Sequence, residues 1–172
     1  MAKWTGTWNS MTNYLDADWL QSVFAEGATE QMDAVALKEA FVQMMSADFK
    51  SCVISGDTFT RYTGADATGT ATAVTYTFKQ QFEAGEEEGF MAYWYAFEGD
   101  QTGPAKYLIA LLPEQHSPAT IEHFHFRYGS EGFQALLDNE QWYATLAKQG
   151  STQEQIKQSL ADVIASLFGG AD

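Results

Sequence analysis

The spacing of apolar residues changes twice along the chain, and each change marks a change of predicted structure. Up to about residue 50, apolar positions recur at helical intervals. Leu20, Val23 and Phe24 share one helical face, and a second helix is expected from about Asp33, whose carboxylate can cap it. The apolar stripe of this second helix comprises Leu37, Phe41, Met44 and Met45. The N-terminal part is therefore predicted to be mainly helical.

From Lys50 onward the chain is rich in Val, Ile, Thr, Tyr and Phe and breaks into short runs typical of strands. A hairpin turn is expected at Gly56-Asp57 and a charged turn at residues 83–89. The strand candidates are Ser51–Ser55, Thr58–Tyr62, Thr70–Phe82, Phe90–Phe97, Ala105–Leu112 and Thr120–Tyr128. Six consecutive strands with short turns favour an antiparallel meander, closed or nearly closed into a barrel.

After Gly129 the helical period returns. Phe133, Leu136 and Leu137 share a face, and the residues from Ser151 to Glu154 match a capping box. The stripe that follows comprises Ile156, Leu160, Val163, Ile164 and Leu167, and it ends before two glycines. Because there are no internal repeats or low-complexity linkers, residues 1–172 are predicted to form a single α+β domain.

Composition narrows the classes of partner. The 172 residues include 9 Lys and Arg against 23 Asp and Glu, a formal charge of -14. Nucleic acids and anionic membranes reward clustered cations, and no such cluster occurs, so neither is an expected partner and cations are favoured instead. The single cysteine, Cys52, excludes an intramolecular disulfide and is expected to be buried.

No targeting or membrane segment is visible. Residues 1–30 show no basic segment followed by an apolar one, so no signal peptide is expected within this chain. No run approaches the roughly 18 apolar residues that a membrane span requires, so membrane insertion is not expected.

The three histidines of the chain, His116, His123 and His125, fall within ten residues. Residues two apart on a strand project to the same face with side chains about 6 to 7 Å apart, so His123 and His125 are near enough to reach one ion. Glu122 and the phenylalanines on either side of His125 face the other way. His116 precedes a proline-containing loop, and a hairpin can bring it back over the pair.

Three neutral imidazoles suit zinc and leave a fourth position for water or a carboxylate. Glu114 would share the face of His116 if that stretch is extended, whereas Glu122 is the weaker candidate. The competing interpretation is a His-x-His pair that is only the polar, half-exposed face of a strand, and the third histidine close by makes it less favoured.

Several segments resemble one family. The C-terminal ones are Ala105-Lys-Tyr-Leu108, Pro118, His123-Phe-His125, Gly129 and Gln134-Ala-Leu-Leu137. The others are Trp4-Thr-Gly-Thr-Trp8-Asn-Ser10, Tyr14-Leu15, Val23-Phe24 and Tyr95-Ala-Phe-Glu98. Together they are similar to the ZinT (YodA) family of bacterial zinc- and cadmium-binding proteins, over nearly the whole chain.

The resemblance implies a calycin-like (lipocalin-like) antiparallel β-barrel with accessory N- and C-terminal helices. It implies one zinc site near the barrel mouth, built from three histidines, in which cadmium can substitute. Members are usually exported, so a periplasmic or cell-surface location is implied. They serve zinc homeostasis or, fused to a metal-binding lipoprotein, capture zinc for an ABC importer.

The first ligand does not match the family pattern cleanly. The family's first histidine precedes the His-x-His by nine residues, and that position here is Glu114, while His116 is shifted by two. Either His116 takes the role, or Glu114 supplies an oxygen ligand, or both bind. His116 is favoured because imidazole is the better zinc ligand. The paired cysteines and the His-rich loop of some members are missing.

The leading prediction is therefore a zinc-binding protein and not an enzyme. A zinc hydrolase or hydratase is one alternative, because three histidines with an open position can activate water. No Ser/His/Asp set or carboxylate pair supports catalysis, however. The other alternative is a lipocalin-like barrel that binds a small apolar ligand.

Overall fold

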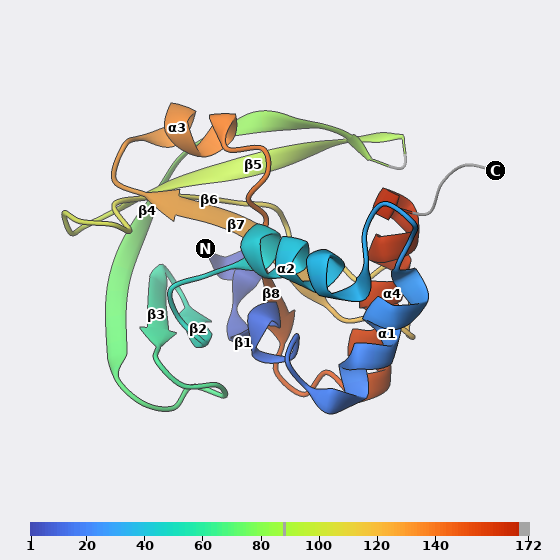
Figure 1. Cartoon of the computed structure of the whole chain (residues 1–172). Coiled ribbons are helices and arrows are strands. Elements are labelled where there is room, and N and C mark those ends of the chain that lie inside the picture. The colour runs from blue at the N-terminus through green and yellow to red at the C-terminus, as the bar shows by residue number, and fades with distance from the viewer. Residues whose placement is uncertain (88, 169–172) are drawn as a thin grey trace.

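The computed structural model describes residues 1–87 and 89–168 and contains a closed antiparallel barrel (Figure 1). Eight strands follow one another in sequence order around the barrel, and the first pairs with the last. They are β1 (Gly6–Ser10), β2 (Ser51–Ser55), β3 (Thr58–Tyr62), β4 (Ala71–Glu87), β5 (Phe90–Gly99), β6 (Tyr107–Ala110), β7 (His123–Gly129) and β8 (Ala144–Lys148). This up-and-down topology confirms the predicted calycin-like α+β class.

Helices cover the outside of the barrel on two sides. They are α1 (Gln21–Gly27), α2 (Ala34–Met45), α3 (Phe133–Asp138) and α4 (Gln153–Phe168), with short 3-10 turns at Ala2–Trp4, Met11–Asn13 and Asp18–Leu20. Figure 1 shows α1, α2 and α4 gathered on one side, with α3 apart from them. One apolar cluster joins α1, α2 and α4 to the outer face of β8, and another joins α3 to β5 and β6.

Two of the eight strands, β1 and β8, were not predicted as strands. The β1 sequence contains Gly6, Asn9 and Ser10, which are poor strand formers. Along β8 four consecutive residues from Ala144 to Ala147 are buried, because one face meets the barrel interior and the other meets the helices. Such a strand has no polar alternation to reveal it.

Turn predictions were partly confirmed. Gly56 adopts the left-handed conformation, φ 58°, in the hairpin between β2 and β3. The predicted charged turn at residues 83–89 was wrong in extent, because β4 continues to Glu87 and pairs with β5 along most of that stretch. The register slips near Gly85, whose φ of 120° suits a bulge. Of the three consecutive glutamates, Glu88 lies outside the described residues.

Helix starts are set by local capping. Asp33 accepts a hydrogen bond from the Ala36 amide at 2.8 Å, which confirms the predicted cap of α2. The capping box of α4 is displaced by one residue from the prediction. Thr152 Oγ1 accepts from the Gln155 amide and Gln155 Oε1 accepts from the Thr152 amide. Ser151 instead donates to the Lys148 carbonyl.

Aromatic side chains fill the inside of the barrel. Trp8, Phe124 and Phe126 are fully buried there, and Trp8 meets Phe124 edge to face at a centroid distance of 4.9 Å. Cys52 is buried in the same cluster as a free thiol, as predicted. Because side chains fill the barrel interior, a binding site is expected on the outer face of the barrel.

Candidate metal centre

Alternation along β7 separates its histidines from its phenylalanines. Phe124 and Phe126 point into the barrel, so His123 and His125 leave the strand on the outer face. The opposite residues on β8 are Ala147 for His123 and Thr145 for His125. The histidine pair therefore lies outside the barrel wall, at the end where β7 begins, and not in the lumen.

A register shift between β6 and β7 brings Glu114 to this face. The Leu111 amide donates to the His125 carbonyl, so a regular ladder would place Pro113 opposite His123. Proline has no N–H to donate, and the chain instead takes one extra residue. Glu114 and His123 then exchange two backbone hydrogen bonds of 2.9 Å each. Opposite residues share a face, which puts the Glu114 carboxylate beside the imidazoles.

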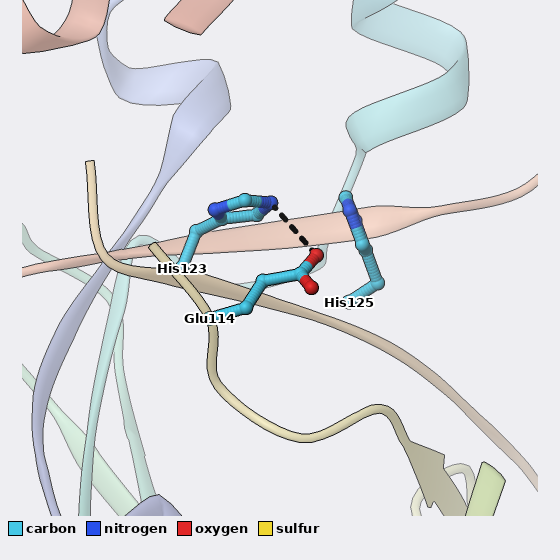
Figure 2. Close-up of side chains that lie close together, drawn as sticks. All are labelled: Glu114, His123 and His125. Carbon is cyan, nitrogen blue, oxygen red and sulfur yellow. Dashed lines mark ion pairs between the residues drawn. The ribbon is translucent and has the colours of Figure 1, made fainter. Parts of the chain in front are cut away.

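Three side chains converge at this point (Figure 2). One ligand atom from each of Glu114, His123 and His125 lies within 4.8 Å of the other two. Glu114 Oε1 is 3.7 Å from His123 Nε2. Donor atoms bound to one tetrahedral zinc at 2.0–2.1 Å stand about 3.3–3.4 Å apart. Small side-chain movements would therefore suffice to place all three on one ion.

His116 lies at the edge of this group. Its Nε2 is 3.6 Å from Glu114 Oε1, and its ring centroid is 5.7 Å from that of His123. The His116 side chain is 48% exposed, whereas that of His123 is only 12% exposed. Of the four predicted site residues, the structure thus forms a compact group of three and places the fourth next to it on the solvent side.

The hydrogen bonds of the two imidazoles leave the same nitrogen of each open. Thr145 Oγ1 donates its only proton to the Tyr143 carbonyl at 2.8 Å, so it accepts from His125 Nδ1 at 3.0 Å. His123 Nδ1 faces the Ile121 carbonyl at 3.5 Å, and a carbonyl can only accept. Both rings therefore carry their proton on Nδ1 and present the lone pair of Nε2 to the group.

Burial keeps both imidazoles neutral. It lowers the pKa of His125 to about 3, with smaller contributions from His123, His116 and Arg127. Burial also lowers the pKa of His123, and the charge of His116 adds to this, while the hydrogen bond to the Ile121 carbonyl opposes it. Neutral imidazoles are the form that binds metal, so the pair is prepared for an ion at neutral pH.

The buried Arg127 side chain supports the wall next to His125. Its guanidinium lies between the rings of Trp94 and Tyr143, 4.7 Å from each centroid, and its Nε donates to the Trp142 carbonyl at 2.6 Å. Tyr143 in turn meets the His125 ring edge to face at 5.7 Å. Arg127 thus anchors the aromatic residue that packs against a site histidine.

A cleft of about 670 Å³ opens beside the histidines. Its walls come from β7, β8, α2, α4 and the β4–β5 hairpin. The apolar residues that line it include Met44, Met45, Trp94, Leu160 and Val163. Among residues 1–87 and 89–168, its acidic residues are Glu86, Glu114 and Asp162, and neither lysine nor arginine lines it. This charge pattern attracts cations.

Glu122 was the weaker ligand candidate in the sequence. Its carboxylate bonds Lys148 at 3.2 Å, away from the group. Sequence reasoning missed Thr145, which sets the tautomer of His125, because Thr145 lies on the strand that was not recognised. It also missed the cleft walls from α2 and α4, whose apolar stripes signal burial but not the neighbouring site.

Fold and site together define a class: a lipocalin-like barrel that carries a group of candidate metal ligands on its outer wall. The sequence matches the model of the ZinT (YodA) family, described as periplasmic lipocalin-like zinc-recruitment proteins, over residues 1–163. The protein belongs to the ZinT family, which confirms the resemblance and the zinc-binding prediction. No curated protein sequence matches the chain.

Two solved structures have a similar fold. One is the Zn(II)-bound ZinT-like domain of Streptococcus pneumoniae AdcA, at TM-score 0.69 and 20% identity, covering 92% of this chain and 88% of that one. The other is Zn(II)-bound AdcA from the same organism, at TM-score 0.71 and 19% identity. It covers 94% of this chain, which spans only 34% of that AdcA chain.

Among residues 1–87 and 89–168, no helix has the length and apolar character needed to cross a bilayer.

Proposed function

We propose that the protein binds one zinc ion through Glu114 Oε1, His123 Nε2 and His125 Nε2, with His116 available as the fourth ligand. The observation that carries this proposal is the convergence of one ligand atom from each of the three side chains within 4.8 Å, together with hydrogen bonds that leave Nε2 of each imidazole open. Two imidazoles and one carboxylate form an established zinc donor set. Cadmium and other divalent ions are expected to substitute.

The proposed ligand set differs from three histidines by one charge. Glu114 occupies the position nine residues before His123, where the family pattern has histidine. A carboxylate reduces the net charge of the loaded site from +2 to +1 and gives it a harder donor. Glu114 as ligand also agrees with its backbone pairing to His123, since that pairing holds its carboxylate on the site face.

We further propose that residues 1–172 act as one domain in extracytoplasmic zinc homeostasis, or pass zinc to an importer. Membership of a periplasmic zinc-recruitment family supports this. The similarity to AdcA, in which such a domain is part of a longer chain, supports delivery to an ABC importer component as the partner. Exposure of His116 at the edge of the site suits an ion that must leave again.

Measuring the zinc content of the purified protein tests the proposal directly. The purified protein, loaded with zinc and dialysed, should retain one equivalent by elemental analysis. A double change of His123 and His125 to Ala should abolish retention. A matched double change of Glu122→Gln and Gln115→Ala, which spares the proposed ligands, should not. Retention by the histidine double variant, or none by the parent, would sink the proposal.

We propose binding, not catalysis, as the role of this ion. Zinc can activate a bound water by itself, but hydrolysis also needs side chains placed to transfer protons and to stabilise the oxyanion, and Glu114 is a ligand in this proposal. Zinc-loaded protein should hydrolyse an activated ester no faster than its histidine double variant. A rate that depends on zinc and on His123 would overturn this assignment.

A further inference from the structure

We infer that the cleft beside the metal centre binds zinc together with a small organic chelator that has a monoanionic donor group and an apolar body. The inference rests on the proposed metal site and deepens it, because it concerns the form in which the ion arrives. Its basis is the volume, wall chemistry and charge of the cleft.

The cleft is far larger than a hydrated ion requires. A water molecule takes about 30 Å³ of liquid volume, so zinc with one or two waters needs less than about 100 Å³. The cleft holds about 670 Å³, which falls within the roughly 300–1,000 Å³ typical of sites for small organic molecules. Zinc and its waters would therefore occupy only a small part of the cleft volume.

Apolar side chains make up much of the cleft wall. Met44 and Met45 line it from α2, and Leu160 and Val163 line it from α4. Methionine side chains adapt to differently shaped apolar groups. Trp94, on the barrel wall, adds an aromatic ring. An apolar body attached to the chelating group would contact the parts of these side chains that face the cleft.

Charge restricts the donor group. Zinc held by Glu114 and two neutral imidazoles carries a net charge of +1, which one anionic donor neutralises. Glu86 and Asp162 also line the cleft, and in the part of the chain that the structure describes neither lysine nor arginine does. These carboxylates would repel a chelator with several negative charges, so a monoanionic group such as a hydroxamate or an amino-acid carboxylate fits best. Zinc sites with three protein ligands can expand to five-coordinate, which leaves room for a bidentate donor in place of His116.

The test uses cobalt(II), which replaces zinc and reports its coordination through its visible spectrum. Cobalt-loaded protein is titrated with acetohydroxamate, benzohydroxamate and citrate, and the affinities are compared with those for free cobalt. Benzohydroxamate should bind at least about tenfold more tightly than acetohydroxamate beyond their ratio on free cobalt, because its ring is buried in the cleft. Citrate should bind more weakly than either. Native mass spectrometry should show protein, metal and hydroxamate together.

A matched pair of variants separates the cleft from the metal. Ser166 lines the cleft from α4 and is exposed, so Ser166→Trp should fill part of it. Ala161 is exposed on the same helix and does not line the cleft. Ser166→Trp should remove the preference for benzohydroxamate while cobalt still binds, and Ala161→Trp should leave that preference intact.

The outcomes distinguish this inference from the metal site on which it rests. Failure of cobalt or zinc to bind at all would overturn the proposed function itself. Cobalt binding with equal relative affinity for the two hydroxamates, or removal of the metal by the hydroxamate without a ternary complex, would overturn the chelator alone. A preference that survives Ser166→Trp would also overturn it.

Discussion

Glu114 and His123 lie directly opposite each other in an antiparallel bridge, joined by two backbone hydrogen bonds of 2.9 Å. The bridge exists because one extra residue enters the chain next to Pro113, which cannot donate to the His123 carbonyl. Without that shift Glu114 would face away from the imidazoles. A local backbone irregularity therefore completes the group of three proposed ligands.

Removing the Glu114 carboxylate should weaken zinc binding strongly. Outer-shell changes typically lower metal affinity by 10–100-fold, so loss of a direct ligand in Glu114→Ala is expected to cost at least about 100-fold. Competition titration with a zinc indicator measures this. Glu122→Gln is the matched control, because Glu122 bonds Lys148 instead. Glu114→His restores the family's ligand type and should keep binding within about tenfold of the parent. Unchanged affinity in Glu114→Ala would exclude Glu114 as a ligand.

His116 should contribute less to affinity than His125. Its side chain is largely exposed and lies at the edge of the group, so ordering it on the ion brings less benefit. His116→Ala is expected to lower zinc affinity by less than about tenfold and to speed zinc release to a chelator, measured by stopped flow. His125→Ala should cost at least about 100-fold. An equal loss in both variants would make His116 a full member of the ligand set.

Thr145 should matter for metal binding although it touches no metal. Thr145→Val removes the acceptor that holds the proton of His125 on Nδ1, and the ring is then free to turn or to change tautomer. Zinc affinity is expected to fall about 10–100-fold. Thr145→Ser keeps the hydroxyl and should bind nearly as the parent does. Equal affinities for the Val and Ser variants would contradict this role.

The free energy of unfolding of the metal-free protein should decrease as the pH falls, because of His125. Above pH 6.5, its ordinary pKa, the imidazole is neutral in both folded and unfolded chains and contributes nothing. Between 6.5 and the folded pKa of about 3 the unfolded chain binds the proton and the folded one does not, so the free energy of unfolding falls as pH falls. His123 acts in the same direction.

Urea unfolding at pH 7.5 and pH 5.0 measures this dependence. The loss between the two values should be smaller in His125→Asn than in the parent, because that variant lacks the titrating ring. The same loss in both proteins would contradict the assigned origin. Zinc should raise the free energy of unfolding at pH 7.5 by mass action and raise it much less at pH 5.0, where protons compete for the ligands.

The spacing of apolar residues along the sequence predicted those helices and strands in which one face is apolar and the other polar. The stripe from Ile156 to Ile164 predicted α4, and alternation in His123-Phe-His125-Phe126 separated a polar from an aromatic face. It failed for β8, where both faces are buried, and for β1, whose composition is poor in strand formers. Leu167, counted in the α4 stripe, is exposed, and the next residue, Phe168, packs on Phe41 instead.

The sequence by itself determined the family, the barrel class and the histidine pair, because these depend on local spacing and on motifs that neighbouring residues carry. Only the tertiary structure decided the rest. The shifted register that selects Glu114, the Thr145 hydroxyl behind His125, and the cleft between α2, α4 and the hairpin all join segments distant in sequence. Such contacts depend on strand pairing and helix packing, which no local pattern of residues records.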